Sequence, residues 1–212
     1  MILLPQRLIW LCAAVIGAIG VSGCAPSFDD AINPIALKGA NEGVVFLKIT
    51  YAGKPCRLGN VALATEPSPG RYVLHSSPTL GGINSAGFNS RQLPLPSGTY
   101  HIGYVQCALD DATRTVVLGE TDGAIQIGNP QQSFAHFTIA AGEVVNLGQL
   151  NLVPTDYLEN SATISITDID ANAMERLKSG VPKLSSMMVS RLMSATDPGR
   201  SHKITWVQAI GG

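Results

Sequence analysis

The stretch that decides the fold reads GVVFLKITY and spans residues 43–51. β-Branched and aromatic residues dominate it, and side chains of these types fit the pleated surface of a sheet. The stretch leads into Gly53-Lys54-Pro55, where glycine and proline predict a turn. Residues 43–51 therefore predict a β-strand that is followed at once by a change of direction.

Seven further stretches repeat this pattern of a short β-rich run bounded by glycine or proline. We expect strands at 60–65, 71–76, 99–109, 114–118, 134–140, 143–153 and 162–169. No segment of helical length separates these runs, which argues against a parallel sheet built from alternating strands and helices. The sequence thus predicts a mainly β protein with the architecture of an antiparallel β-sandwich.

Strict alternation along the predicted strand 99–109 divides its side chains between two faces. One face carries Tyr100, Ile102 and Tyr104. The other face is expected to comprise His101, Gly103, Val105 and Cys107.

Two stretches resemble a known family. The run LPSGTY at residues 95–100 is similar to the strand entry of transthyretin-like and carboxypeptidase-regulatory-like β-sandwiches, whose general form is also immunoglobulin-like. The run AGEVVNLG at residues 141–148 resembles the hairpin that follows in small bacterial envelope lipoproteins with such domains. The resemblance implies a sandwich fold and a mostly non-catalytic module, while the fold itself does not fix the function.

After residue 169 the spacing of apolar residues changes to three and four. The residues at this spacing are Met174, Leu177, Val181, Leu184, Met188 and Leu192. They predict an amphipathic helix that Asp170 or Asn172 can cap, and Gly180 and Pro182 should divide it into two. We expect these helices to cover the sandwich, although the methionines leave open a surface that binds a partner. The run Lys203–Val207 predicts an added edge strand.

The first 24 residues have the layout of a secretory signal. One basic side chain, Arg7, precedes an apolar run from Leu8 to Val21, and small residues follow. The run is about 14 residues long, whereas a membrane-spanning helix needs roughly 20. We therefore predict a cleaved signal peptide over residues 1–23, and the alternative is an N-terminal helix that is not cleaved.

The signal ends in Val21-Ser22-Gly23-Cys24, which resembles the lipobox of bacterial lipoproteins. In that family the cysteine receives a diacylglycerol, the signal is cut before it, and the new N-terminus is usually acylated, with chains such as palmitate. The resemblance implies lipidation of Cys24 and stable anchoring in membrane lipid. Ala25 follows the cysteine, which by similarity with enteric lipoproteins favours the outer membrane. We expect an exported protein held at the cell envelope.

Composition narrows the partners and the domain organisation. The 212 residues include 14 basic and 15 acidic side chains, and nucleic-acid binders are typically basic, so we expect no nucleic acid as partner. Residues 24–42 predict the lipidated N-terminus and a flexible tether because they are small, polar and proline-containing. Residues 43–169 should form the sandwich, and residues 170–212 the helical appendage and tail.

The four cysteines have different expected fates. Cys12 leaves with the signal and Cys24 takes the lipid, so Cys56 and Cys107 remain. Exported proteins fold in an oxidising compartment, which favours a disulfide between these two. It would close a loop of 51 residues and stabilise the fold by at most about 4 kcal/mol in the chain-entropy model, a figure that strain often reduces. Free thiols or a metal site, with His101 as the nearest further ligand, are the alternatives.

No motif indicates catalysis or a metal centre. Asp168, Asp170 and Asn172 begin like a calcium loop, but Ala173 and Ser179 stand where that loop requires glycine and glutamate. We therefore interpret the carboxylates as groups at the start of a helix, where they interact with the positive end of its dipole.

The histidines and serines leave one catalytic alternative open. The histidines are scattered singly, at His75, His101, His136 and His202. The segment 82–87 differs by one residue from a Gly-x-Ser-x-Gly nucleophile elbow. A Ser-His-Asp site can still assemble from distant residues, here around His101 or His136. The long loops 77–90 and 119–133 are better candidates for binding.

These expectations combine into a membrane-anchored envelope lipoprotein that is a binding or structural module rather than an enzyme. Its expected partners are membrane lipid, through the acylated Cys24, and an envelope protein of unknown identity. We expect no catalytic residues, no cofactor and no metal. The alternatives are a small membrane-tethered hydrolase and a carrier of a ligand or metal.

Overall fold

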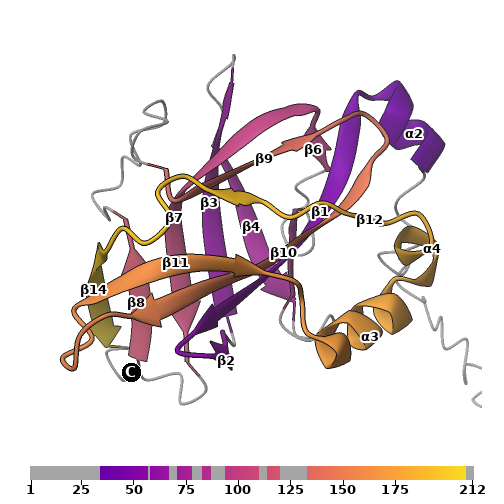
Figure 1. The fold of residues 1–212 in the computed structure, drawn as a ribbon. Coiled ribbons are helices and arrows are strands. Elements are labelled where there is room, and N and C mark those ends of the chain that lie inside the picture. Colours follow the sequence, from indigo (N-terminus) through magenta and orange to yellow (C-terminus); the bar gives the residue numbers. More distant parts are fainter. Residues whose placement is uncertain are drawn as a thin grey trace, which may run out of the picture.

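The computed structural model describes residues 34–56, 58–66, 71–77, 83–86, 94–109, 114–119 and 133–208. Strands make up most of this part of the chain (Figure 1), which confirms the mainly β class. The helices are α2 (Pro34–Gly39), α3 (Ala171–Gly180) and α4 (Pro182–Ser185). The strands are β1 (Glu42–Tyr51), β2 (Lys54–Pro55), β3 (Leu58–Glu66), β4 (Arg71–Ser77), β5 (Ile83–Ala86), β6 (Leu95–Pro96), β7 (Gly98–Ala108), β8 (Arg114–Leu118), β9 (Ala135–Ile139), β10 (Val144–Pro154), β11 (Ser161–Thr167), β12 (Val189–Ser190), β13 (Ser194–Ala195) and β14 (His202–Gln208).

The strand pairings run round a closed ring. From β1 the order is β5, β4, β3, β7, β8, β14, β11 and β10, and β10 pairs again with β1. The β1–β10 pair is parallel, with Val44 opposite Val144 and Tyr51 opposite Leu152. The other pairings in this ring are antiparallel. The finer expectation of an antiparallel sandwich is not confirmed, because the sheet is mixed and its pairings are continuous.

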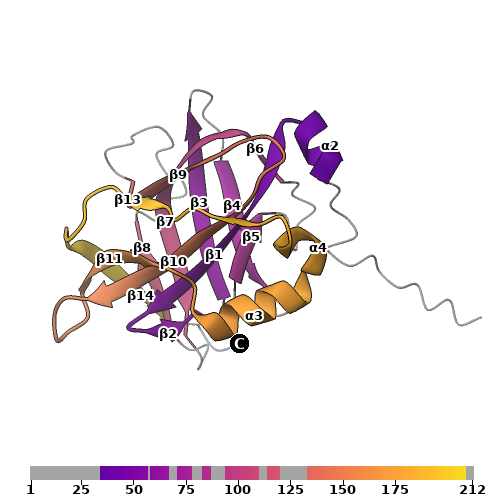
Figure 2. The same cartoon turned by 45° about the vertical axis from the view of Figure 1, so that its right-hand side comes forward.

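Two long strands each pair with two different strands along one edge. The C-terminal half of β7 pairs with β8 and its N-terminal half with β9. β10 likewise pairs with β12 near its start and with β11 from Gln149 onward. The segment 189–196 links β10 to the chain that leads into β9. The Met193 backbone amide donates a hydrogen bond to the Leu147 carbonyl, and the Thr196 backbone amide donates one to the Phe134 carbonyl. Figure 2 shows this segment running past β10 toward β9.

Inward-facing side chains of the ring form the inner core. Its large, fully buried members are Leu47, Ile49, Leu74, Leu95, Tyr100, Ile102, Leu118 and Ile139. Tyr100 also fixes the entry into β7, because its hydroxyl donates a 2.6 Å hydrogen bond to the Pro96 carbonyl. The LPSGTY stretch thus forms a compact connection from β6 into β7. Leu95 of β6 pairs with Gly43 of β1.

A bulge in β7 breaks the alternation that the sequence predicted. The register between β3 and β7 shifts so that Ala62 faces Tyr104 and Leu63 faces Ile102, which leaves Gly103 as an extra residue. Val105 and Cys107 therefore join Tyr100 and Ile102 in the inner core. The prediction that placed Tyr104 with Tyr100 was wrong for this reason.

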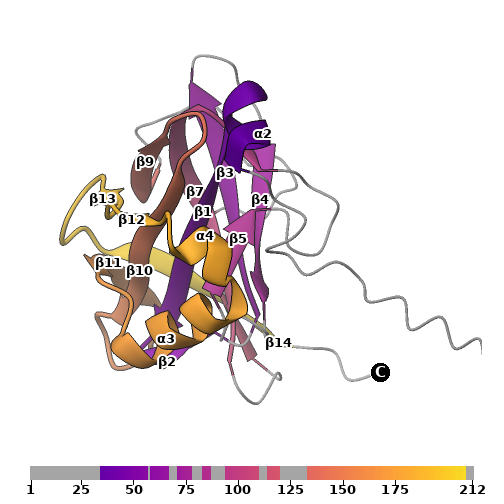
Figure 3. The same cartoon turned by 90° about the vertical axis from the view of Figure 1, so that its right-hand side faces the viewer.

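The outer face of β1 carries a second, smaller core beneath the helices. Its members are Leu37, Val44, Phe46, Val144, Ile169, Ala173, Leu177, Val181 and Leu184. Figure 3 shows α3 and α4 on this side of the sheet. Because β1 is buried on both faces, its sequence is a nearly continuous apolar run rather than an alternating one.

The C-terminal region is only partly helical. Asp170 caps α3, and α4 begins at Pro182, as the break at Gly180 and Pro182 predicted. Beyond α4 the chain is extended, so Met188 and Leu192 lie outside any helix although they follow the helical spacing. Pairing with the free edge of β10 overrides the periodicity there.

Two elements differ from their expected setting. α2 lies inside the stretch 24–42, and its Leu37 is 4 % exposed in the outer core, so the described part of the expected tether is folded against the body. β14 is not an edge strand, because it pairs with β11 on one side and β8 on the other. None of the described helices is long and apolar enough to cross a membrane.

Candidate functional site

Two adjacent large apolar side chains at the turn between β10 and β11 are exposed to solvent. Tyr157 is 99 % exposed and Leu158 is 72 % exposed. We call residues 155–160 the hairpin tip. It projects from the end of the molecule that lies farthest from α2 (Figures 1 and 2). Two large apolar side chains placed side by side in water contribute nothing to packing, which marks the tip as a candidate contact surface.

Hydrogen bonds hold the hairpin tip in one conformation. The Asp156 carboxylate accepts bonds from the Asn160 amide, at 3.0 Å, and from the Ser161 hydroxyl. The Ser161 hydroxyl, followed by the Asn160 amide, lowers the pKa of Asp156 below its ordinary value. Glu159 adopts a left-handed conformation with φ of 52°, which turns the chain back toward β11. The exposed pair therefore sits on an ordered turn.

The tip is also fastened to the neighbouring strand β14. The Trp206 indole donates a 3.0 Å hydrogen bond to the Glu159 carbonyl, and the Ile204 amide donates a 2.8 Å bond to the Asn160 carbonyl. Trp206 packs edge-on against Tyr51, with ring centres 5.5 Å apart. Burial, followed by the Glu159 carboxylate, raises the pKa of the Tyr51 phenol. The base of the tip is thus continuous with the inner core.

The charge within the tip is negative, while basic residues stand at its base, where Arg114 lies over the Trp206 ring and Lys203 pairs with Ser161. Asp156 and Glu159 immediately flank Tyr157 and Leu158, and the tip itself contains no basic residue. The lowered pKa of Asp156 keeps that carboxylate ionised at neutral pH. The surface is a small apolar knob with an acidic rim.

The structure brings together two of the histidines that the sequence left scattered. His101 of β7 lies directly opposite His136 of β9, and their ring centres are 6.0 Å apart. Both residues are half-buried on the outer face of the sheet. His136 also stands opposite Ser194 of β13. Sequence reasoning missed this juxtaposition because it depends on the register of two strands that are 35 positions apart.

The other two histidines lie elsewhere. His75 is in β4, opposite Asn60 of β3. His202 begins β14, and its ring packs edge-on against Phe134 with ring centres 4.9 Å apart. Burial, followed by the charge of Arg200, lowers the pKa of His202. Among the residues that the structure describes, no three or more His, Cys, Asp or Glu side chains are arranged to hold a metal ion.

Asp170, one of the carboxylates whose spacing begins like that of a calcium loop, caps the start of α3. Asp170 accepts a 2.9 Å hydrogen bond from the Ala173 amide and forms an ion pair with the buried Lys48. The Lys48 ammonium, followed by the Ala173 amide, lowers the pKa of Asp170. The sequence left open whether Asp170 or Asn172 caps this helix, and the structure assigns the cap to Asp170.

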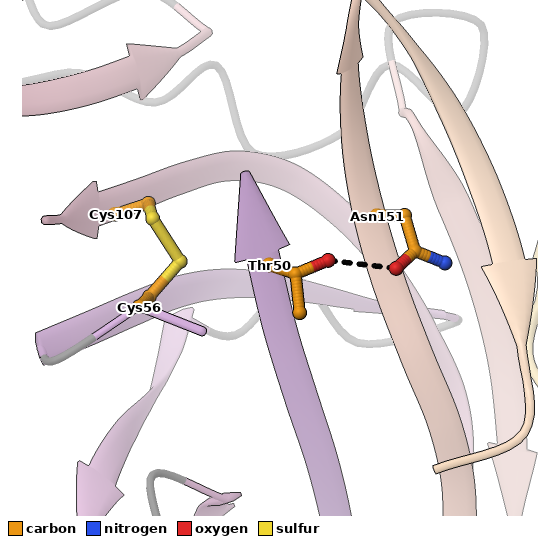
Figure 4. Close-up of a disulfide and its surroundings, with 4 residues drawn as sticks. All are labelled: Thr50, Cys56, Cys107 and Asn151. Carbon is orange, nitrogen blue, oxygen red and sulfur yellow. Dashed lines mark hydrogen bonds between the residues drawn. A yellow bond between two sulfur atoms is a disulfide. The ribbon is translucent and has the colours of Figure 1, made fainter. Parts of the chain in front are cut away.

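The structure joins Cys56 to Cys107 by a disulfide, with Cα atoms 5.1 Å apart (Figure 4). Both cysteines are buried in the inner core, at 2 % and 0 % exposure. The bond ties the chain just before β3 to the end of β7. On the opposite side of β1 from this bond, Thr50 donates a 2.7 Å hydrogen bond to Asn151 of β10, which adds a polar link to the parallel pair.

Several predicted sites lie outside the described residues. Cys24 and the signal peptide 1–23 are among them, as is most of the predicted loops 77–90 and 119–133. Within the first loop, residues 83–86 form β5, which pairs with both β4 and β1.

Comparisons with known proteins return no match: no family model, no curated protein and no solved structure is significantly similar to this chain.

Proposed function

We propose that this chain is an exported lipoprotein, anchored in membrane lipid through Cys24, whose folded body is a non-catalytic module that binds an envelope protein. The observation that carries the binding role is the hairpin tip, where Tyr157 and Leu158 are exposed on an ordered turn. The signal-like start and the lipobox resemblance support the anchor, with the outer membrane favoured.

Position argues that the tip contacts a protein rather than the anchoring membrane. Cys24 precedes Pro34 by ten residues, which span at most about 35 Å when extended. An anchor at Cys24 therefore keeps α2 near the membrane. The tip lies at the other end of the body from α2 (Figure 1), so a body whose α2 end faces the membrane directs the tip away from that surface.

Charge indicates the kind of partner surface. Acidic side chains on both sides of the apolar pair disfavour anionic lipid, because like charges repel. They favour a pocket with an apolar floor for Tyr157 and Leu158 and basic residues at its rim. Tyrosine is enriched at the centres of protein interfaces, since it buries a large apolar ring and keeps one hydroxyl for hydrogen bonding.

Site-specific photocrosslinking in cells tests this role. A photoreactive residue at position 158 should form a crosslink to one protein species, and the same residue at the exposed position 175 of α3 serves as the matched control. In the Tyr157→Ser background the crosslink from position 158 should fall by more than about tenfold, because an interface residue of this type contributes over 1.4 kcal/mol. Equal capture from positions 158 and 175 would contradict the proposal.

The anchor has a separate test. Mass spectrometry of the N-terminal peptide should show a diacylglycerol on Cys24, and the Cys24→Ser protein should leave the membrane fraction. A protein that still begins at residue 1 and carries an unmodified Cys24 would show instead that the N-terminal segment is not cleaved.

A second candidate function, a small membrane-tethered hydrolase, is favoured by one observation. His101 and His136, its best candidates for a general base, lie opposite each other on neighbouring strands. Alanine at both positions should then abolish any turnover of ester or amide substrates. Turnover that survives the double substitution would remove this candidate.

A further inference from the structure

We propose that His101 and His136 form a binding site for a divalent transition-metal ion, Zn²⁺ or Cu²⁺. The two residues face each other across the β7–β9 pairing, so both imidazoles project from the same face of the sheet. This inference does not depend on the hairpin tip or on the anchor.

The separation of the rings matches a shared ion. A metal held about 2.0–2.1 Å from one nitrogen of each ring places two imidazole centres about 5 Å apart at a tetrahedral angle and about 6 Å apart at a wider one. The observed centres are 6.0 Å apart and the ring planes differ by 33°. Small rotations of the two side chains are therefore sufficient to direct one nitrogen of each toward a common point.

The backbone beneath the pair is held firmly. Two residues along the same face, Thr99 and Thr138 join their hydroxyls across the strands at 3.2 Å. On the opposite face, Tyr100 stacks on Phe137 with ring centres 5.3 Å apart. Cross-strand contacts on both faces fix the register, so the two histidines need little reorganisation to bind an ion.

An ion at this site would be partly shielded from solvent. Both ring nitrogens of His101 are buried, while each histidine keeps part of its surface in solvent. Two histidines fill two of the four positions of a tetrahedral ion, and no larger group of His, Cys, Asp or Glu ligands occurs among the described residues. Water or a partner's side chain would complete the shell. Imidazole suits both Zn²⁺ and Cu²⁺, and Cu²⁺ should bind more tightly.

Calorimetric titration of the full chain in detergent with Zn²⁺ alone tests the site. We expect one ion per chain. His101→Gln and His136→Gln should each weaken binding by more than about tenfold, because each removes one of two ligands. His202→Gln is the matched control and should bind as the unsubstituted protein does. Each variant's melting temperature without metal checks that it still folds.

Electron paramagnetic resonance of the Cu²⁺-loaded, unsubstituted protein gives a second readout that needs no variant. We expect a signal coupled to two imidazole nitrogens. The proposal is overturned if Zn²⁺ fails to bind at about 1 mM, if the double variant binds unchanged, or if the Cu²⁺ spectrum lacks two coordinated imidazoles.

Discussion

The two hydrophobic cores lie on opposite faces of β1 and are assembled in different ways. The inner core collects side chains from strands all round the ring, so residues far apart in the sequence depend on one another. The outer core is a patch in which α2, α3 and α4 cover Val44 and Phe46 of β1. We therefore expect damage to the outer core to affect the ring less than damage to the ring affects the helices, which pack on β1.

Strand β10, the parallel neighbour of β1, contains a bulge. Opposite Leu47 of β1, the register shifts at Leu147 and Gly148. Gly148 has φ of +87°, and a Cβ atom there would lie 2.6 Å from the Thr167 carbonyl oxygen. Glycine is therefore required twice, for the backbone conformation and for the close approach of β11.

The inner core should respond as one unit. Leu47→Ala empties a fully buried position, and we expect a loss of about 4 kcal/mol in the free energy of unfolding. Urea denaturation followed by both far- and near-ultraviolet circular dichroism should show one coincident transition. Val207→Ala, at a position that is 45 % exposed, is the control and should change stability by less than about 0.5 kcal/mol. Separate transitions for the ring would contradict a single inner core.

The second prediction concerns the disulfide, whose two cysteines are buried in the inner core. Replacing Cys56 and Cys107 together by alanine should lower the free energy of unfolding by about 3 kcal/mol, because the bond restricts the unfolded chain over 51 residues. Dithiothreitol should bring the unsubstituted protein to a similar stability. If dithiothreitol added to the urea-unfolded protein, where the bond is accessible, leaves the stability unchanged, the two thiols are not joined.

The outer core should respond locally. Leu177→Ala removes a fully buried side chain of α3, and we expect a loss of about 2 kcal/mol that is confined largely to the helices. Hydrogen exchange should speed up at the amides of α3 while those of β7 stay protected. Equal acceleration in β7 would show that the two cores are coupled through β1.

The smallest effect concerns the ion pair at the edge of the outer core. Asp170→Asn keeps a good capping residue and removes the charge that meets Lys48, so we expect a loss of under about 1 kcal/mol at neutral pH. The Asp170 side chain is 48 % exposed, and salt should therefore shrink the difference.

The pH dependence of the free energy of unfolding tests the same ion pair. Because Lys48 and the Ala173 amide lower the pKa of Asp170 in the folded protein, the unfolded chain takes up the proton first as the pH falls. The stabilisation is present above about pH 4, the ordinary range of an aspartate, and is lost as the pH drops through the folded pKa. The free energies of unfolding of the Asp170→Asn variant and the unsubstituted protein should therefore converge in acid. A difference between them that stays constant down to about pH 2 would contradict this.

The local features of the fold were within reach of the sequence. Some short β-rich runs, such as Arg114–Leu118, form strands with their expected bounds. The break at Gly180 and Pro182 divides the two helices as predicted. These features depend on neighbouring residues, whose spacing the sequence displays directly.

The long-range features were not within reach. The parallel pairing of β1 with β10 joins residues 100 positions apart, and no turn signal connects them. The bulge at Gly103 shifts the faces of β7, and only the register of β3 reveals it. The histidine pair needs the same information. The hairpin tip could have been suspected from Tyr157 and Leu158, which stand between polar residues in a short turn.

The position of β14 has a consequence for the timing of folding. Among the described strands of the ring this one comes last in the sequence, and until it pairs, β8 and β11 both present open edges. Chains are synthesised from the N-terminus, so these edges stay exposed until residues 202–208 have been made and can pair. Exposed edges invite pairing with another copy. The hazard of aggregation is therefore set by how quickly residues 202–208 arrive, and not by the stability of the finished ring.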